Sequence, residues 1–336
     1  MKVLVLGGAG YIGAVLTSYL KEKGMEVVVF DNFLYEKNIW KKYGPNAIKA
    51  DVRNIDKLQP AIDTADAVVN LAAISNDPAS DLRPKLTWQV NFKVNETIAK
   101  LCRGSHKRVV YASSCSVYGF SSEGEFNEES NMAPVTLYAR TKMLSEECYL
   151  DKNVDGIILR FATVYGHSPR PRFDLVVNTM IGTSYFENKI VVNGGNQWRP
   201  VVHVKDVAQA IYLALISKNH KYRIYNVGSN EQNYRISDLG KIIHNKVPQV
   251  KLILNESSID NRSYKVNFDR IVKDLGFKAK YSIGDAVVEI YNEFKQGNIK
   301  NMENDVYYRV KYLKKHTNNG EAKRNFITDT IFKLLF

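Results

Sequence analysis

The sequence has little of several features that mark specialised classes of protein. It contains three cysteines, Cys102, Cys115 and Cys148, and no Cys-x-x-Cys pair, which excludes a disulfide framework and a zinc site of that spacing. Nine prolines in 336 residues exclude a Pro-rich, largely disordered chain. No apolar run approaches the roughly 18 residues of a membrane span. We therefore expect a cytoplasmic protein of the reducing cytosol, with no metal site and no membrane span.

Acidic residues are fewer than basic ones, 35 Asp plus Glu against 47 Lys plus Arg, so the formal net charge is +12. Such an excess attracts anions in general, whether nucleic acids, membrane surfaces or small molecules. No basic tract interleaved with aromatic residues is present, which argues against nucleic acid. Residues 291–336 carry nine Lys plus Arg against five Asp plus Glu. We expect this basic C-terminal extension to pack as helix, with its final Ile-Phe-Lys-Leu-Leu-Phe as an alternative contact for a partner or a membrane.

Strand and helix patterns alternate along the first half of the chain. The apolar run 2–6 predicts a strand, residues 15–20 have helical spacing, and 27–30 predict a second strand. The pattern resumes with strands at 67–71, 108–111 and 156–160 and with helices at 86–103 and from Tyr138. We expect an α/β protein with a Rossmann-type, doubly wound parallel sheet and a smaller, discontinuous α/β substrate domain. The predicted division is 1–166 plus 201–227 for the dinucleotide-binding domain, 167–200 plus 228–290 for the substrate domain, and 291–336 for the extension.

A glycine-rich turn follows the first predicted strand. Gly8-Ala9-Gly10-Tyr11-Ile12-Gly13 satisfies G-x-G-x-x-G, and Gly7 extends it. The first glycines allow backbone N–H groups to approach a pyrophosphate, and the last allows close packing of helix on strand. Asp31 ends the next predicted strand, near the spacing of about 20 residues expected of the acid that binds the adenosine ribose. Because a carboxylate repels a 2′-phosphate, the sequence favours NAD over NADP.

A second group of residues points to proton transfer. Tyr138 and Lys142 lie four residues apart on a predicted helix, so their side chains share one face. We expect the Lys142 ammonium and an oxidised nicotinamide to lower the pKa of Tyr138 and make it a proton acceptor. Ser114 lies just past the strand at 108–112, at the edge of the sheet where ligands bind, and can hydrogen-bond the reacting hydroxyl.

Together these motifs resemble the extended short-chain dehydrogenases/reductases, the nucleotide-sugar epimerase and dehydratase family. The resemblance covers about residues 1–290. The matching segments are Gly7 to Gly13, Leu71-Ala72-Ala73, Ser113 to Gly119, Tyr138-Ala139-Arg140-Thr141-Lys142, Leu159-Arg160-Phe161 and Val164-Tyr165-Gly166.

The resemblance implies a catalytic triad of Ser114, Tyr138 and Lys142, and a second domain that holds a UDP-, GDP- or dTDP-linked sugar. Arg199 and Arg262 match the family's diphosphate contacts, and arginine suits this role because its planar fork grips phosphate oxygens. Asn178 is expected to add an amide contact to the substrate. A homodimer through the helices at 86–103 and 138–150 is also implied. The expected cofactor residues are Gly7, Gly10, Tyr11, Ile12, Gly13, Asp31, Asn32, Asp51, Val52, Leu71, Ala72, Ala73, Tyr138 and Lys142.

The residues after Ser114 bear on the type of reaction. Enzymes similar to dTDP-glucose 4,6-dehydratase carry an Asp-Glu pair there, whereas this chain has Cys115 and Ser116, which disfavours dehydration. Cys115 is one position away from the catalytic cysteine of 3,5-epimerases similar to GDP-fucose synthase, and a buried structural role is favoured. His167 could act as the partner acid for that chemistry, but the sequence favours a solvated side chain at this position. For His203 it favours a position in the core.

Reversible oxidation at C4 of the sugar remains. The first hypothesis is an NAD-dependent nucleotide-sugar 4-epimerase. The second is a 4-dehydrogenase or 4-ketoreductase, because residues 160–178 resemble a subgroup that includes GDP-heptose 4-dehydrogenases, and Thr163 stands where UDP-galactose 4-epimerase carries Asn. A third is a non-enzymatic NAD-binding module, against which the intact Ser114, Tyr138 and Lys142 argue.

Overall fold

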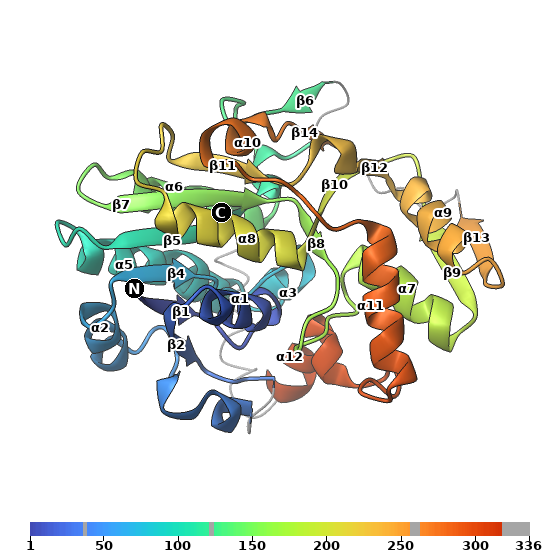
Figure 1. Ribbon diagram of the computed structural model, residues 1–336, viewed down its shortest axis with the longest axis horizontal. Helices are drawn as coiled ribbons and strands as arrows, with labels where there is room; N and C mark the ends of the chain where they lie inside the picture. Colours follow the sequence, from blue (N-terminus) through green and yellow to red (C-terminus); the bar gives the residue numbers. More distant parts are fainter. Residues whose placement is uncertain (36–38, 121–123, 256–262, 318–336) are drawn as a thin grey trace.

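A computed structural model describes residues 1–35, 39–120, 124–255 and 263–317 (Figure 1). Its centre is a seven-stranded, fully parallel sheet in the order β11-β7-β5-β4-β1-β2-β3. The strands are β1 (Lys2–Leu6), β2 (Glu26–Asp31), β3 (Ala47–Lys49), β4 (Ala67–Asn70), β5 (Arg108–Ser114), β7 (Asp155–Phe161) and β11 (Ile224–Val227). The chain winds outward from β1 in both directions, so a crevice is expected at the carboxyl ends of β1 and β4. The expected doubly wound sheet is confirmed.

Helices cover both faces of this sheet (Figure 1). One face packs α1 (Tyr11–Glu22) and α8 (Val204–Ile216), and the other packs α2 (Ile55–Asp63), α5 (Val94–Cys102) and α6 (Leu137–Leu150). Alternate residues of β1 point to opposite faces, with Val3 and Val5 in one core and Leu4 and Leu6 in the other. Burial on both faces explains why these strands read as continuous apolar runs.

A second hydrophobic core lies beside the sheet, in the segments assigned by sequence to the substrate domain. It joins α7 (Val176–Phe186), β9 (Lys189–Asn193), α9 (Ile236–Lys246) and α11 (Ile283–Lys295), and β13 (Lys251–Asn255) pairs with β9. Three short strands, β8 (Thr163–Tyr165), β10 (Trp198–His203) and β12 (Asn233–Arg235), form a separate sheet. The domain boundaries given by sequence stay a prediction.

The helix expected over 86–103 is interrupted. The structure has α4 (Pro84–Trp88), a π-helical turn over Gln89–Lys93, and then α5. Inside that turn Asn91 is buried, and its side-chain amide pairs with both backbone groups of Ile74, at 2.8 Å to the N–H and 3.0 Å to the carbonyl. The wider π-helical turn allows the Asn91 amide to point inward and pair with Ile74. This pairing is a tertiary contact, which the spacing of hydrophobic residues does not reveal.

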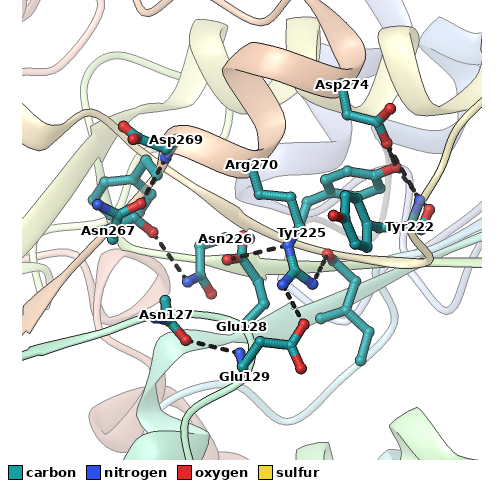
Figure 2. A network of polar contacts seen from close by, with 12 residues as sticks. Asn127, Glu128, Glu129, Tyr222, Tyr225, Asn226, Asn267, Asp269, Arg270 and Asp274 are labelled. Carbon is teal, nitrogen blue, oxygen red and sulfur yellow. Dashed lines mark hydrogen bonds and ion pairs between the residues drawn. The ribbon is translucent and has the colours of Figure 1, made fainter.

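A polar network fastens the chain around β6 (Glu125–Phe126) to the edge of the main sheet (Figure 2). Glu128 accepts the backbone N–H of Asn226, on β11, at 2.8 Å. Arg270, on α10 (Asp269–Leu275), forms ion pairs with both Glu128 and Glu129. Beside them, β6 pairs with β14 (Lys265–Val266). The segment that follows Ser114 is therefore anchored to β11 by a contact between residues 98 positions apart.

The described part of the C-terminal extension ends in a helix, α12 (Arg309–Thr317). This agrees with the helical packing expected from the sequence. The final Ile-Phe-Lys-Leu-Leu-Phe lies outside the described residues. Among the described helices, none combines the length and apolar character needed to cross a bilayer. Within the same residues, no group of three His, Cys, Asp or Glu side chains is placed to hold a metal ion.

Candidate active site

The glycine turn forms the floor of a pocket at the carboxyl end of β1. Gly7 has φ of 77°, which favours glycine, and α1 begins directly after Gly10. A Cβ on Gly13 would lie 2.3 Å from the carbonyl oxygen of Gly7, so only glycine allows this approach. The backbone N–H groups at the start of α1 are thus brought to the pocket, an arrangement suited to phosphate oxygens.

Asp31 lies at the end of β2 and faces the glycine turn. Its carboxylate accepts N–H groups from Ala9 at 3.0 Å and from Phe33 at 2.8 Å, which fixes its orientation. Burial raises the pKa of Asp31, and the charges of Arg309 and Arg170 oppose that rise. Both oxygens keep a lone pair for the ribose hydroxyls that the sequence analysis assigned to this residue.

The cofactor residues expected from sequence fall into two groups. Nine of them line one pocket of about 350 Å³: Gly7, Gly10, Asp31, Asn32, Asp51, Val52, Leu71, Ala72 and Ala73. In that pocket Asp51 is paired with Arg53 at 2.9 Å, which holds the pKa of the carboxyl below its usual value. Tyr11, Ile12 and Gly13 do not line it. The Tyr11 hydroxyl instead donates to the carbonyl of Gly166 at 2.6 Å, and this contact joins α1 to the end of β8.

Ser114 and Tyr138 meet on the other side of the same sheet edge. Ser114 ends β5, and Tyr138 stands in the first turn of α6, whose N-cap Thr136 accepts the N–H of Ala139 at 3.2 Å. Both side chains line a cleft of about 870 Å³. Lys142, one turn further along α6, is buried, and its ammonium donates to the carbonyl of Ala112 at 2.6 Å. The structure therefore brings the three expected catalytic residues together.

Burial dominates the pKa values of both side chains. Burial raises the pKa of Tyr138 to about 12, and the negative charge of Asp77 adds to the rise. Burial lowers the pKa of Lys142 to about 7. Desolvation of the phenolate thus outweighs the protein's own cations around Tyr138, and the lowering expected from Lys142 and an oxidised nicotinamide together stays a prediction. A phenolate at neutral pH needs further positive charge, which an oxidised nicotinamide carries.

A buried ion pair behind the site was missed by the sequence analysis. Glu146 follows Lys142 on the same face of α6 and meets Arg160 of β7 at 2.6 Å. Ser113, next to Ser114, donates to the Glu146 carboxylate, and Arg160 also donates to the hydroxyl of Tyr118 at 2.9 Å. The pair ties α6 to β5 and β7. Its signal in the sequence is an acid at the next helical turn after Lys142 and an arginine inside an apolar strand.

The cleft beside Tyr138 extends toward the second core. Thr163, Arg199 and Tyr264 also line it, and the Arg199 guanidinium lies over the Tyr264 ring at 5.5 Å. The expected diphosphate contact Arg199 is thus on the same cleft as the proposed base. Arg262 lies outside the described residues.

Asn178 does not line the cleft, contrary to the expectation. Its amide N–H groups lie within hydrogen-bond distance of the Tyr11 hydroxyl and of the carbonyls of Gly166 and Arg172, at 3.1 to 3.3 Å, and its oxygen accepts the N–H of Gly166 at 2.9 Å. These contacts use both N–H groups of the amide and one acceptor position of its oxygen. Asn178 therefore fixes the turn after β8, and the arrangement gives no support to a substrate contact.

The other reactive side chains face away from the cleft. Cys115 is fully buried, its thiol points to the carbonyl of Arg160 at 3.3 Å, and burial raises its pKa far above the usual thiol value. His203 is buried in the core as expected, beside Glu289 at 3.3 Å. His167 is partly buried near Glu293, and burial lowers its pKa. The structural interpretation of Cys115 is confirmed.

Comparison with known proteins shows the family of this chain. The sequence model of the NAD dependent epimerase/dehydratase family matches residues 3–228. The chain belongs to this family. Its members are enzymes, and NAD is the family's cofactor. The pocket fits that cofactor, because a Cβ at Gly13 would close the glycine turn and the charged groups at its rim suit a dinucleotide.

Individual proteins of known sequence or structure match this chain along nearly their whole length. A protein of Methanocaldococcus jannaschii described as a putative UDP-glucose 4-epimerase is 27% identical over 88% of this chain and 99% of its own. The solved UDP-glucuronic acid 4-epimerase of Bacillus cereus has a TM-score of 0.74 at 24% identity, covering 88% of this chain and 99% of its own. An NAD-dependent NDP-hexosamine 5,6-dehydratase, TunA, has a TM-score of 0.76 at 22% identity, covering 88% and 98%. The two structures support the fold.

Proposed function

We propose that this protein is an NAD-dependent nucleotide-sugar 4-epimerase. The observation that carries the proposal is the composition of the large cleft. Ser114 and Tyr138 reach it from the sheet edge and Arg199 from β10, while the residue after Ser114, Cys115, is turned into the core. The cleft thus offers a base for a hydroxyl and a cation for a diphosphate. It lacks the acid–base pair that water elimination requires at positions 115 and 116.

The chemistry follows from the placement of these side chains. Tyr138 accepts the proton of the sugar 4′-hydroxyl, and Ser114 holds that oxygen by a hydrogen bond. When bound, NAD supplies a reversible acceptor for the hydride at C4. The resulting 4-keto sugar turns over in the cleft, so that its other face would be presented to the cofactor, and Tyr138 gives the proton back to the oxygen. Arg199 holds the diphosphate throughout, so the sugar rotates about a fixed anchor, and Arg262 is proposed to share this task.

Two of the three named proteins carry the same reaction in their descriptions, whereas TunA is a dehydratase. The relative from Methanocaldococcus jannaschii is described as a putative UDP-glucose 4-epimerase, and the solved one from Bacillus cereus as a UDP-glucuronic acid 4-epimerase. We propose a nucleoside diphosphate sugar as substrate, with UDP-, GDP- and dTDP-linked sugars as the candidates. We also propose a homodimer through α5 and α6, as the family resemblance implies.

A 4-dehydrogenase or 4-ketoreductase is the second candidate. The observation that favours it is Thr163, which lines the cleft where UDP-galactose 4-epimerase carries Asn. In this reaction the 4-keto sugar leaves or arrives instead of turning over.

The two candidates are separated by incubating the purified protein with UDP-, GDP- and dTDP-sugars without added cofactor. An epimerase accumulates the 4-epimer over many turnovers, because NAD is regenerated in each cycle. A dehydrogenase instead yields one equivalent of reduced cofactor per chain and a 4-keto product, and this result would overturn the first proposal. The Tyr138→Phe variant, with the same bound cofactor, is the control for chemistry at this site.

A further inference from the structure

The C-terminal extension reaches the cofactor pocket. The hydroxyl of Tyr312, on α12, donates to the carbonyl of Leu34 at 2.5 Å, and its ring packs on Tyr35 with centroids 4.8 Å apart. In Figure 1, α12 lies beside the chain that leaves β2. Arg309, Tyr312 and Leu313 consequently line the same pocket as Gly7 and Asp31. This helix lies beyond residues 3–228, where the family match is found.

Two guanidinium groups in this pocket have unused donors at buried nitrogen atoms. Arg170 is 3% exposed and stacks over the Tyr35 ring at 4.0 Å. One of its terminal nitrogens donates to the carbonyl of Val306 at 3.1 Å, whereas the other, Nη1, has no hydrogen-bond partner among the described residues. Within that same part of the chain, the buried Nε of Arg309 also has none.

The positive charge here exceeds the negative charge placed against it. Arg172 holds the Asp174 carboxylate at 2.8 and 3.0 Å, and that carboxylate also accepts the backbone N–H of Arg309 at 3.2 Å. Among the described residues, no carboxylate forms such a pair with the side chain of Arg170 or Arg309. Burial lowers the pKa of both groups, that of Arg170 to about 9, and the charge of Arg309 adds to the fall for Arg170. Buried cations without an anion are costly, so this arrangement is suited to an anionic ligand.

The position of Arg309 identifies which part of a dinucleotide is involved. Its charge acts on Asp31, assigned to the adenosine ribose, and also on Tyr138, at the end where the nicotinamide reacts. The group that joins those two ends of NAD is the pyrophosphate. A 2′-phosphate does not fit, because it would lie against the Asp31 carboxylate.

We propose that Arg170 and Arg309 bind the pyrophosphate of NAD opposite the glycine turn, so that α12 completes the cofactor site. The pyrophosphate is then held from two sides, by backbone N–H groups at the start of α1 and by two guanidinium groups. Docking of α12 and binding of NAD are coupled, since each favours the same arrangement. Part of the positive charge of the extension, unassigned by sequence, has a role in this site.

The test measures binding, so it is independent of which sugar reaction is catalysed. Dissociation constants of NAD, ADP-ribose and adenosine are compared for the full-length protein and its Arg309→Gln variant. We expect affinity for NAD and ADP-ribose to fall by about tenfold or more, and affinity for adenosine to be unchanged. Lys314→Gln, which removes an exposed charge from the same helix, is the matched control and is expected to bind all three as the wild type does.

Three outcomes of these titrations would contradict the proposal. Unchanged affinity for ADP-ribose shows that Arg309 does not touch the pyrophosphate. If the affinity for adenosine falls equally, Arg309 only shapes the pocket. If the protein prefers NADP to NAD and Arg309→Gln abolishes that preference, Arg309 binds a 2′-phosphate instead. Arg309→Lys keeps the charge and should recover part of the affinity. As a second measurement, saturating NAD should slow amide exchange in α12 of the wild type, and much less in Arg309→Gln.

Discussion

Replacing Glu146 by Gln leaves Arg160 buried without an anionic partner. In the native structure the two side chains are 1% and 2% exposed and are joined by contacts of 2.6, 3.0 and 3.1 Å. Removing one partner of such a pair costs about 3–5 kcal/mol, because the remaining charge stays desolvated. This is a large share of the roughly 5–15 kcal/mol that stabilises a typical protein. We therefore expect Glu146→Gln to lower the free energy of unfolding by about 3 kcal/mol or more.

The measurement is urea unfolding of the wild type, Glu146→Gln and a control. Glu147→Gln is the matched control, because it removes the same charge from the next position of α6, where the side chain is exposed. We expect the control to change stability by less than about 0.5 kcal/mol. The double variant Glu146→Leu, Arg160→Met removes both charges, so its loss should be smaller than the sum of the losses measured for Glu146→Leu and Arg160→Met separately.

Two results would refute this reasoning. If Glu146→Gln unfolds at the same urea concentration as Glu147→Gln, the buried pair does not stabilise the fold. If the losses of the double variant are simply additive, the two charges do not depend on each other. Because the pair also joins α6 to β5 and β7, activity is expected to fall together with stability in Glu146→Gln.

Three further changes test the site. Tyr138→Phe should lower turnover by about 10²- to 10⁴-fold while bound NAD, counted per chain after denaturation, is retained; normal turnover would exclude Tyr138 as the base. Gly13→Ala should weaken NAD binding in titrations, because its Cβ would lie 2.3 Å from the rigid carbonyl oxygen of Gly7. The control Gly284→Ala should bind NAD normally, because its Cβ would approach the flexible Lys246 side chain, with Cε at 2.7 Å. Burial lowers the pKa of Lys142 from 10.5 to about 7, so above pH 7 the unfolded chain binds this proton and the folded chain does not. Stability against urea should therefore rise from about pH 7 to 8.5, and Lys142→Met should flatten that rise; an unchanged slope would contradict it.

Much of the fold was predictable from the sequence, because its signals are local. Buried parallel strands give continuous apolar runs such as Val27 to Phe30, and the glycine turn must lie between a strand and a helix. The four-residue spacing of Tyr138 and Lys142 predicts a shared helical face, and the structure has it. These features depend on neighbours within a turn or a strand, which the sequence displays directly.

The features that the sequence did not reveal depend on contacts between distant segments. Asn178 was expected on the substrate, yet its amide is used by Tyr11, 167 residues away. The pKa of Tyr138 is set by how deeply the side chain is buried, which spacing along a helix does not reveal. The role of Glu146 required knowledge that Arg160 faces it across two elements.

The parallel sheet, the glycine turn with Asp31, and the Ser, Tyr and Lys residues at the sheet edge could be read from the amino-acid sequence, since each follows from backbone geometry and short-range periodicity. Which charges are buried together depends on how the chain folds. Arg170 and Arg309 are 139 positions apart in the sequence and still line one pocket. Net charge records how many cations a chain has, but electrostatic energy depends on where folding places them and on how much water it removes.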